Sequence, residues 1–349
     1  MNEYAFTIDI YNSQMRRKIT AAMKKYNRAL LIMPKYFGYE EKIKSEFRMQ
    51  GISSETIYEN VDEISFIYRF VYVYLKKYKA SIMEKYYGNK LKNLKQPPDI
   101  ILVIRGQSLT KKVMDQMKTL YPGAEYIMYQ WDSVENNKEI LDITNYFDRI
   151  LTFDMKDADK YGWKYRPLFY CSGAERNDSR KYDLTFIGSL HSQRIAIVNK
   201  IHDIASQKGL HEFTYLFTIR THYLKQKCIL HNTDFANGKN EDIKYKSLSL
   251  VETNNIFAES NIVVDYTHPK QNEFTMRTIE SIGNKCKLIT NNKNVLQADF
   301  YNSNNVYVYD PENFTIPDQF LNEPFIELPD EIYERYSIKS WIKDILGIE

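Results

Sequence analysis

The stretch from residue 261 to 292 reads NIVVDYTHPKQNEFTMRTIESIGNKCKLITNN and decides the fold of this chain. It opens with a buried-strand pattern at 261–266, and a polar loop follows at 267–272. The pattern then predicts a helix over about 273–282 and a second apolar strand at 287–290. Strand, loop, helix and strand in this order form one βαβ unit, which places the loop and the helix start at the ligand-binding edge of a parallel sheet.

The side chains at this predicted helix start suit a ligand that carries phosphate. Thr275 and Met276 lie where free N–H groups can meet an anion, and Arg277 adds a positive charge. Glu280 lies close to Arg277 on the same helix face. Charge on an exposed helix face is the competing explanation for both residues, but the flanking strands favour function. Two loop residues, His268 and Gln271, are weaker candidates for a ligand contact.

A second glycine-bearing turn is predicted earlier in this half of the chain. Gly188 and Ser189 end an apolar strand and precede a helix that contains Arg194. A glycine there lets the backbone approach a ligand, and the arginine is able to reach a phosphate. A tight turn with a solvated arginine is the plainer alternative.

Several of these segments resemble one enzyme family. Residues 274–280, FTMRTIE, and 287–292, KLITNN, resemble the donor-sugar site of GT-B glycosyltransferases, in a bacterial polysaccharide branch related to CgeB-like enzymes. The likeness continues in residues 182–190, YDLTFIGSL, and 129–133, YQWDS. The resemblance implies that Glu280 binds ribose hydroxyls while the helix start meets the diphosphate. Many retaining members space two glutamates one residue further apart than Glu273 and Glu280, so the resemblance assigns Glu273 no firm role.

Composition bounds the class of protein. A chain of 349 residues fits two domains, and 43% hydrophobic with 27% charged residues is typical of a globular protein. The net charge of +3 and the absence of a basic arm argue against nucleic acid as a partner. Three widely separated cysteines favour reduced thiols. Neither a signal peptide nor a spanning segment is recognised, so we expect a cytoplasmic protein, free or on the inner face of the membrane.

Alternating strands and helices predict two doubly wound α/β domains. The resemblance implies that these form a GT-B fold, with two Rossmann-like domains facing each other across a cleft. We expect an acceptor domain at 1–171, a nucleotide-sugar domain at 172–336, and a C-terminal helix at 337–349 that crosses back. Strands are predicted at 29–33, 55–58, 99–104, 125–129, 149–153, 184–187, 213–218, 261–266, 287–290 and 306–309. Helices are predicted at 39–49, 62–87, 110–120, between the strands at 125–129 and 149–153, and at 193–207, 273–282 and 337–346; residues 220–246 are predicted to be irregular.

The end of the strand at 125–129 offers a candidate catalytic base. An inverting transferase needs a carboxylate or histidine to accept the proton of the acceptor hydroxyl, and Asp132 follows that strand. A turn or helix-cap role is the simpler explanation for this aspartate. Arg105 and Gly106 follow the strand at 99–104 and are similarly placed for acceptor binding.

No metal site is expected. Asp157 and Asp159 have the spacing of a metal-binding Asp-x-Asp pair, but they fall in the first turn of a predicted helix, where acidic residues complement the dipole. A GT-B enzyme stabilises the leaving diphosphate with a helix dipole and basic side chains. We therefore predict metal-independent transfer without a cofactor, the nucleotide sugar being a substrate.

A basic and aromatic segment suggests contact with anionic lipid. Lys76–Lys95 holds seven lysines against one acidic residue, Glu84, and includes Tyr78, Tyr86 and Tyr87. Such a helix is able to lie on a membrane surface. A helix with one solvated face explains the same pattern.

The sequence therefore predicts a glycosyltransferase that moves a sugar from a nucleotide-sugar donor to a glycan or lipid-linked acceptor. The resemblance implies a role in bacterial capsule, lipopolysaccharide or other surface polysaccharide biosynthesis. Two alternatives stay open: an enzyme like a non-hydrolysing sugar-nucleotide epimerase, and a non-catalytic protein that binds nucleotide sugars. Fold analogy does not decide among them.

Overall fold

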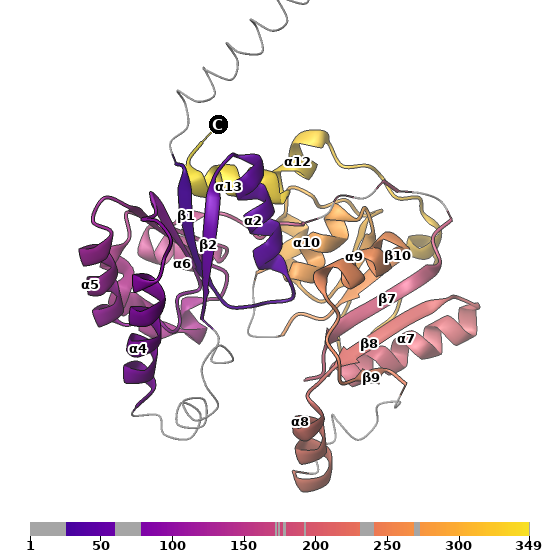
Figure 1. Ribbon diagram of the computed structural model, residues 1–349. Helices are drawn as coiled ribbons and strands as arrows, with labels where there is room; N and C mark the ends of the chain where they lie inside the picture. Colours follow the sequence, from indigo (N-terminus) through magenta and orange to yellow (C-terminus); the bar gives the residue numbers. More distant parts are fainter. Residues whose placement is uncertain are drawn as a thin grey trace, which may run out of the picture. The chain divides into compact units, whose positions relative to one another are not determined.

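The computed structural model describes residues 26–59, 78–171, 173, 175–176, 179–191, 193–230, 241–268 and 273–348. The chain forms two compact units (Figure 1). The first comprises the described parts of 1–33, 47–128 and 139–149, and the second those of 34–46, 129–138 and 150–349. The domain limits predicted from the sequence remain a prediction.

The first sheet has the strand order β2-β1-β3-β4-β5-β6. Its strands are β1 (Arg28–Met33), β2 (Ser53–Tyr58), β3 (Ile100–Ile104), β4 (Glu125–Gln130), β5 (Arg149–Thr152) and β6 (Lys164–Tyr165). The helical segments along it are α2 (Tyr39–Met49), α4 (Lys79–Lys92), α5 (Lys111–Leu120), the 3-10 helices Val134–Asn136 and Lys138–Tyr146, and α6 (Met155–Tyr161). Every residue of β3 is buried, as expected of a strand covered on both faces of a parallel sheet.

The second sheet is parallel throughout and has the order β12-β11-β10-β7-β8-β9. Its strands are β7 (Tyr182–Ser189), β8 (Glu212–Phe217), β9 (Ile243–Lys244), β10 (Ser260–Asp265), β11 (Lys287–Thr290) and β12 (Val306–Val308). Numbered from β7, this is the strand order 3-2-1-4-5-6 of a dinucleotide-binding fold. The order reverses between β7 and β10, which is where such sheets bind ligands.

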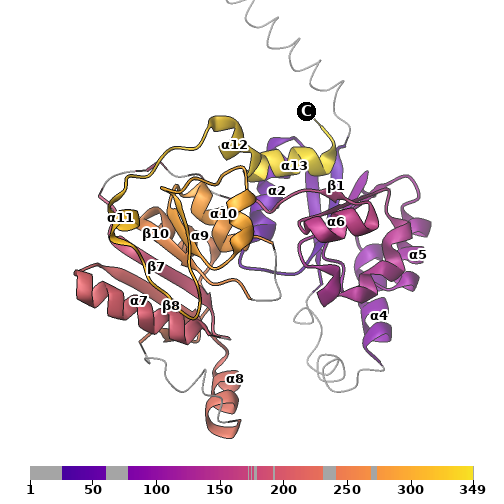
Figure 2. The same cartoon turned by 180° about the vertical axis from the view of Figure 1, so that it is seen from behind.

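Helices cover both faces of the second sheet (Figure 2). The helices that follow β6 in the chain are α7 (Arg194–Lys208), α8 (Arg220–Leu224) with its π-helical continuation Lys225–Ile229, α9 (Leu250–Ala258), α10 (Met276–Gly283), the 3-10 helix Lys293–Gln297, α11 (Asp318–Asn322), α12 (Asp330–Arg335) and α13 (Ile338–Leu346). Of these, α7, α9 and α10 pack directly on the second sheet. Alternate side chains of β10 point to opposite faces of the second sheet. Ile262 and Val264 join the apolar cluster of α7, whereas Val263 packs with Phe257 of α9.

Four local predictions differ from the structure. The helix predicted from 273 begins at Met276, because Thr275 is the residue whose side chain caps it. The segment predicted to be irregular contains α8 and its π-helical turn. The helix predicted between β4 and β5 is of the 3-10 type. Within the helix predicted at 62–87, residues 62–77 lie outside the described residues, and α4 extends beyond it to Lys92.

Candidate functional site

Three neighbouring strands of the second sheet end side by side with polar residues. β7 ends at Ser189, β10 at Asp265 and β11 at Thr290, and the last two are register partners. This edge lies at the point where the strand order reverses. The polar residues therefore gather at the expected ligand-binding edge of the sheet.

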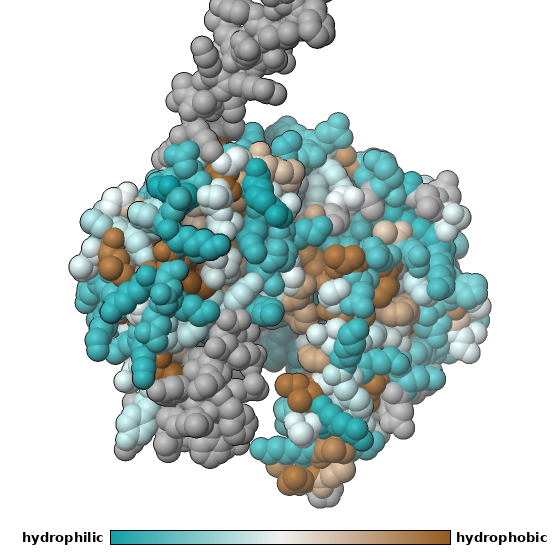
Figure 3. Space-filling view, in the orientation of Figure 1, coloured by the Kyte–Doolittle hydropathy of each residue, from teal (hydrophilic) through white to brown (hydrophobic). Residues whose placement is uncertain are grey.

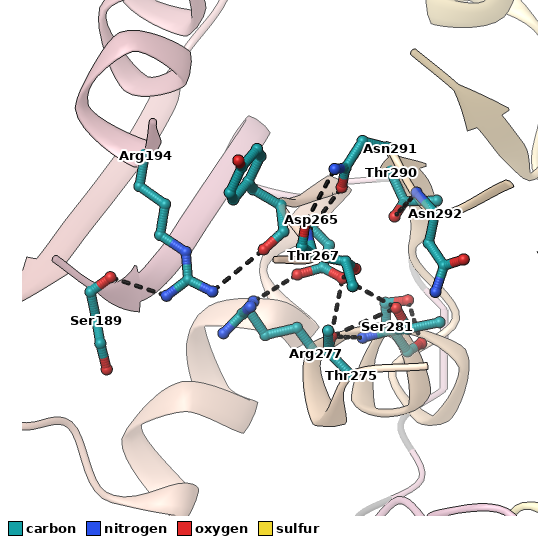
Figure 4. Close-up of polar contacts among 12 residues, drawn as sticks. Ser189, Arg194, Asp265, Thr267, Thr275, Arg277, Ser281, Thr290, Asn291 and Asn292 are labelled. Carbon is teal, nitrogen blue, oxygen red and sulfur yellow. Dashed lines mark hydrogen bonds and ion pairs between the residues drawn. The ribbon is translucent and has the colours of Figure 1, made fainter. Parts of the chain in front are cut away.

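Asp265 organises this edge (Figure 4). Its buried carboxylate accepts hydrogen bonds from the Thr275 hydroxyl (2.8 Å) and the Thr278 hydroxyl (3.1 Å), and it pairs with the Nε of Arg277 at 2.7 Å. A fourth bond comes from the Thr267 hydroxyl at 3.2 Å. These bonds hold the first turn of α10 against the end of β10, and they fix the position of the Arg277 Nε atom.

The electrostatics agree with this arrangement. Burial alone would raise the pKa of Asp265, but Arg277, the Thr275 hydroxyl and Arg194 outweigh it and hold the pKa below its usual range. The carboxylate is therefore charged. Arg277 pairs with this carboxylate and Arg194 acts on it through space, so two positive charges accompany one negative charge at this edge of the described structure.

Arg194, the first residue of α7, lies across the end of β7. Its guanidinium donates to the Ser189 carbonyl at 2.8 Å and to the Tyr266 carbonyl at 3.1 Å (Figure 4). The Nε atom is buried and has no hydrogen-bond partner. Burial, followed by repulsion from Arg277, lowers the pKa of Arg194 to about 9. A buried guanidinium with an unused donor is suited to an anionic ligand.

Gly188 is required by the position of Arg194. A Cβ atom at Gly188 would lie 3.2 Å from the Arg194 Nη1 and 3.2 Å from the Phe186 ring. The glycine thus makes room for the arginine, which is a more specific role than the close ligand approach predicted from the sequence.

Two histidines lie next to the arginines. The rings of His191 and His268 are 6.3 Å apart, centroid to centroid. Burial, together with repulsion from Arg194 and then Arg277, lowers the pKa of His191 to about 4. The two arginines thus add their repulsion to the larger effect of burial. Gln271, predicted in the same loop, lies outside the described residues.

Asn291 and Asn292, which follow β11, hold the loops around the start of α10. Asn291 accepts from the Thr267 N–H at 2.7 Å and donates to the Thr267 carbonyl at 2.9 Å. Asn292 donates to the Glu273 carbonyl at 3.1 Å. These bonds hold both ends of the β10–α10 loop against the edge of the sheet.

Glu280 does not join the Asp265 cluster. Its buried carboxylate accepts from the Cys171 N–H (3.3 Å) and the Tyr39 hydroxyl (3.3 Å), all three residues belonging to the second unit. Burial raises its pKa to about 8, so the carboxyl is largely protonated at neutral pH. Its predicted ribose contact stays a prediction.

Glu273 has a structural partner. Its carboxylate accepts from the Met155 N–H at 3.2 Å, at the start of α6, where Asp154 is the capping residue. Burial raises the pKa of Glu273 to about 7. The glutamate at the start of the predicted 273–282 helix thus contacts the N-terminus of a different helix.

The candidates that follow β3 and β4 lie in loops. Asp132 is half-buried and precedes Ser133, the capping residue of a 3-10 helix, so it is not itself the cap. Arg105 and Gly106 both have positive φ, 76° and 71°. The buried carboxyl of Glu59 accepts from the backbone N–H groups of Gly106 and Ser108. Two backbone donors of this loop are therefore used internally.

The metal and membrane candidates also have internal partners. Asp157 accepts from the Val134 N–H at 2.7 Å, and no group of three or more metal-ligating side chains occurs among the residues the structure describes. On α4, Tyr87 is fully buried and bonds to Ser108 at 2.7 Å, so it cannot enter a lipid surface. Within the described ranges, no helix has the length and apolarity needed to cross a membrane.

Sequence reasoning missed the residue at the centre of the site. Asp265 was read only as part of a strand, although a carboxylate at the end of an apolar strand was a usable signal. Thr278, His191 and the roles of Asn291 and Asn292 were missed as well. Their contacts depend on which strands become neighbours, which the local pattern does not contain.

Comparison with known proteins supports the fold. No protein-family model matches the chain, and no curated protein matches it in sequence. Among solved structures, Anabaena HepE in complex with UDP-glucose has a TM-score of 0.54 at 10% identity, covering 91% of this chain and 98% of that one. A glycosyltransferase from Rickettsia africae (TM-score 0.46, 12% identity, 93% and 99% covered) and the catalytic domain of Arabidopsis thaliana starch synthase IV (0.49, 10%, 93% and 96%) are more distant. The chain has a GT-B fold with two Rossmann-like sheets.

Proposed function

We propose that this protein is a glycosyltransferase whose second unit binds a nucleotide-activated sugar. The observation that carries the proposal is the pair of guanidinium groups, Arg194 and Arg277, at the switch point of the second sheet, where the buried carboxylate of Asp265 pairs with Arg277. A diphosphate would supply the missing negative charge and would meet the start of α10.

The remaining roles follow the sequence prediction. Thr275, Met276 and Arg277 contact the diphosphate, with Gly188, Ser189 and Arg194 on its other side. His268 and Gln271 contact the donor, and Glu280 binds the ribose. Asp132 acts as the base that accepts the proton of the acceptor hydroxyl.

The wider setting is part of the same proposal. The acceptor is a glycan or a lipid-linked glycan of a bacterial capsule or lipopolysaccharide, and the CgeB-like resemblance supports this setting. Transfer needs neither a metal ion nor a cofactor, because arginines and a helix dipole are able to stabilise the leaving diphosphate. The protein acts at the inner face of the membrane.

The first experiment measures thermal stabilisation by UDP, GDP, CMP and ADP and their common sugars, with and without EDTA. A ligand at a hundred times its dissociation constant adds about 2.7 kcal/mol to the free energy of unfolding. We expect one nucleotide family to raise the melting temperature, with or without EDTA. A shift that EDTA removes would contradict metal-independent binding.

Variants locate the binding site. We expect Arg277→Met to weaken nucleotide binding at least about tenfold, because a charge-assisted contact is lost. The control is Arg335→Met, which removes an exposed arginine that pairs with Asp299 and Glu331 in the same unit. Equal affinity in Arg277→Met and the wild type would remove the assignment.

Products separate catalysis from binding. We expect Asp132→Asn to retain nucleotide affinity while it loses transfer to the acceptor. Conversion of the donor without any acceptor would indicate the epimerase-like alternative. Nucleotide binding with neither transfer nor slow donor hydrolysis would indicate the non-catalytic alternative.

A further inference from the structure

A short helix on the second unit exposes an unusual number of apolar side chains. α8 and its π-helical continuation run from Arg220 to Ile229 and stand away from the sheet in both views (Figures 1 and 2). The exposed fractions of its large apolar side chains and their flanks are 63% for Ile219, 47% for Leu224, 68% for Ile229 and 55% for Leu230. Figure 3 shows brown residues interspersed with teal ones at the projection that this helix forms.

The helix is anchored to the core. Tyr223, its one buried residue, belongs to the apolar cluster of the second sheet. The Tyr223 hydroxyl accepts from the Lys227 amine at 3.0 Å, and the ring contacts that of Tyr245 at 6.1 Å. The exposed apolar groups are therefore presented on a fixed element of structure.

The π-helical turn affects which side chains align. In a π-helix the hydrogen bond runs from residue i+5 to residue i, and the Leu230 N–H bonds to the Lys225 carbonyl at 3.0 Å. Residues five apart thus lie near each other at this turn, which brings Leu224 and Ile229 to one side. The turn concentrates apolar surface that an α-helix would spread.

The charge along this helix has one sign. Arg220, Lys225 and Lys227 lie within the helix, and no aspartate or glutamate occurs between Glu212 and Asp234. Apolar side chains with interleaved cations are the features of a helix that lies in a lipid interface, where the cations meet anionic headgroups. A helix that docks on another protein would have no need for charged side chains of a single sign.

We propose that the helix at 220–230 is a docking surface for an anionic membrane. Leu224, Ile229 and Leu230 enter the headgroup boundary, while Arg220 and Lys225 meet the lipid phosphates. The inference is independent of the proposed catalytic function, because vesicle binding needs no nucleotide. It is also distinct from the lysine-rich segment that includes α4.

The test is partition of the full-length protein onto vesicles of phosphatidylcholine, alone or mixed with phosphatidylglycerol. We expect binding to the mixed vesicles only, and weaker binding as salt is raised. Each cation near an anionic surface changes partition about fivefold, so Arg220→Glu with Lys225→Glu should reduce binding at least about twentyfold. Leu224→Glu with Ile229→Glu should abolish it. These side chains are exposed, so melting temperatures should stay near that of the wild type.

A matched variant tests the rival surface. Lys90→Glu with Lys92→Glu makes the same change of charge on α4, and we expect it to alter binding by less than about threefold. Loss of binding in this variant alone would overturn the proposal, as would wild-type binding by the α8 variants. The wild type could also bind no vesicles and instead self-associate in a way that Leu224→Glu with Ile229→Glu prevents. That result would show that the patch is a protein interface, and it would equally overturn the proposal.

A local readout places the lipid. Cys228 is exposed on the same helix, whereas Cys286 is buried. An environment-sensitive fluorophore on Cys228, in a Cys171→Ser background, should shift to shorter wavelength on mixed vesicles. Vesicle binding without that shift would place the contact elsewhere and contradict the proposal.

Discussion

At the scale of single residues, the site depends on where charge is held in the protein interior. Asp265 is kept ionised by arginines and hydroxyls, whereas Glu280 is surrounded by groups that do not compensate for its burial. Both are buried carboxyls near the two ends of α10, and their protonation states differ. Burial raises a carboxyl pKa unless enough donors or cations oppose it.

Glu280→Gln should change stability in a pH-dependent way. The pKa of Glu280 is raised to about 8 in the folded protein, so the unfolded chain binds fewer protons between its ordinary pKa and 8. Stability therefore falls as the pH rises through that window. The variant lacks this loss, so we expect a higher melting temperature than the wild type at about pH 8 and a similar one at about pH 4.

The exposed residue Glu139 provides the control for that measurement. Glu139→Gln should give the same difference from the wild type at both pH values. A Glu280→Gln variant that is equally destabilised at both would show that the carboxyl is not protonated in the folded protein.

Asp265→Asn tests the central carboxylate. Removing one partner of a buried charge pair typically costs about 3–5 kcal/mol, because the other charges lose their compensation. Denaturant unfolding should show a loss of that order, and added inorganic phosphate should restore part of it by replacing the negative charge. Unfolding identical to the wild type would mean that Arg277 does not depend on Asp265.

At the scale of elements, α10 is held at both ends. Thr275 caps its start and bonds to Asp265, and near its end Gly283 packs against the ring of Tyr170. A Cβ atom at Gly283 would lie 2.4 Å from the Tyr170 Cγ. The helix therefore has little freedom to shift along its axis.

Gly283→Ala should consequently destabilise the protein. Overpacking of this kind costs about 1–3 kcal/mol. The added Cβ would meet the Cβ and Cγ atoms of Tyr170, which ring rotation does not move away. Gly123→Ala is the matched control, since a Cβ atom there meets nothing within 4 Å. We expect the control to lie within about 0.5 kcal/mol of the wild type in denaturant unfolding. Equal effects of the two substitutions would contradict the packing argument.

The accuracy of each prediction depended on the kind of pattern in the sequence. Buried parallel strands such as β3 and β11 were predicted within one residue, because continuous apolar runs bounded by polar residues are unambiguous. The start of α10 was three residues out, since the cap is chosen by the contact between Thr275 and Asp265. The helix at 220–229 was missed because it buries only Tyr223 and so lacks an amphipathic pattern.

The sequence predicted only part of the candidate site, because local spacing does not encode contacts between distant residues. Thr275 and Arg277 lie at the sheet edge that the βαβ pattern indicated, and Ser189 and Arg194, predicted from a separate turn, lie at the same edge. Glu280 faces Cys171 and Tyr39 instead, because side-chain direction depends on packing that is not encoded in spacing along one helix.

At the scale of the whole molecule, each of the two sheets has a switch point, and the switch point of the second sheet carries the positive charge that suits an anion. At the β1–β3 edge the buried Glu59 carboxyl already occupies the N–H groups of Gly106 and Ser108. At the β7–β10 edge the arginines outnumber the carboxylate. Nucleotide should therefore bind the second unit.

Hydrogen exchange can distinguish the two edges. We expect a nucleotide to slow amide exchange at the start of α10 and the start of α7, with little change in the Arg105–Ser108 loop. Protection confined to that loop would reverse the assignment of donor and acceptor units.

The strand order of the second sheet also bears on how the protein is made. β7 pairs with β10, so Tyr182 meets Ser260 only after the intervening 77 residues have been synthesised. Sheets that depend on such distant pairings form slowly, and their apolar strands are exposed to aggregation in the meantime. On the ribosome, the first sheet has all six strands once residue 165 has emerged, whereas β7 waits for β10. Truncations that end before residue 260 should therefore leave β7 and β8 as the segments that chaperones recognise.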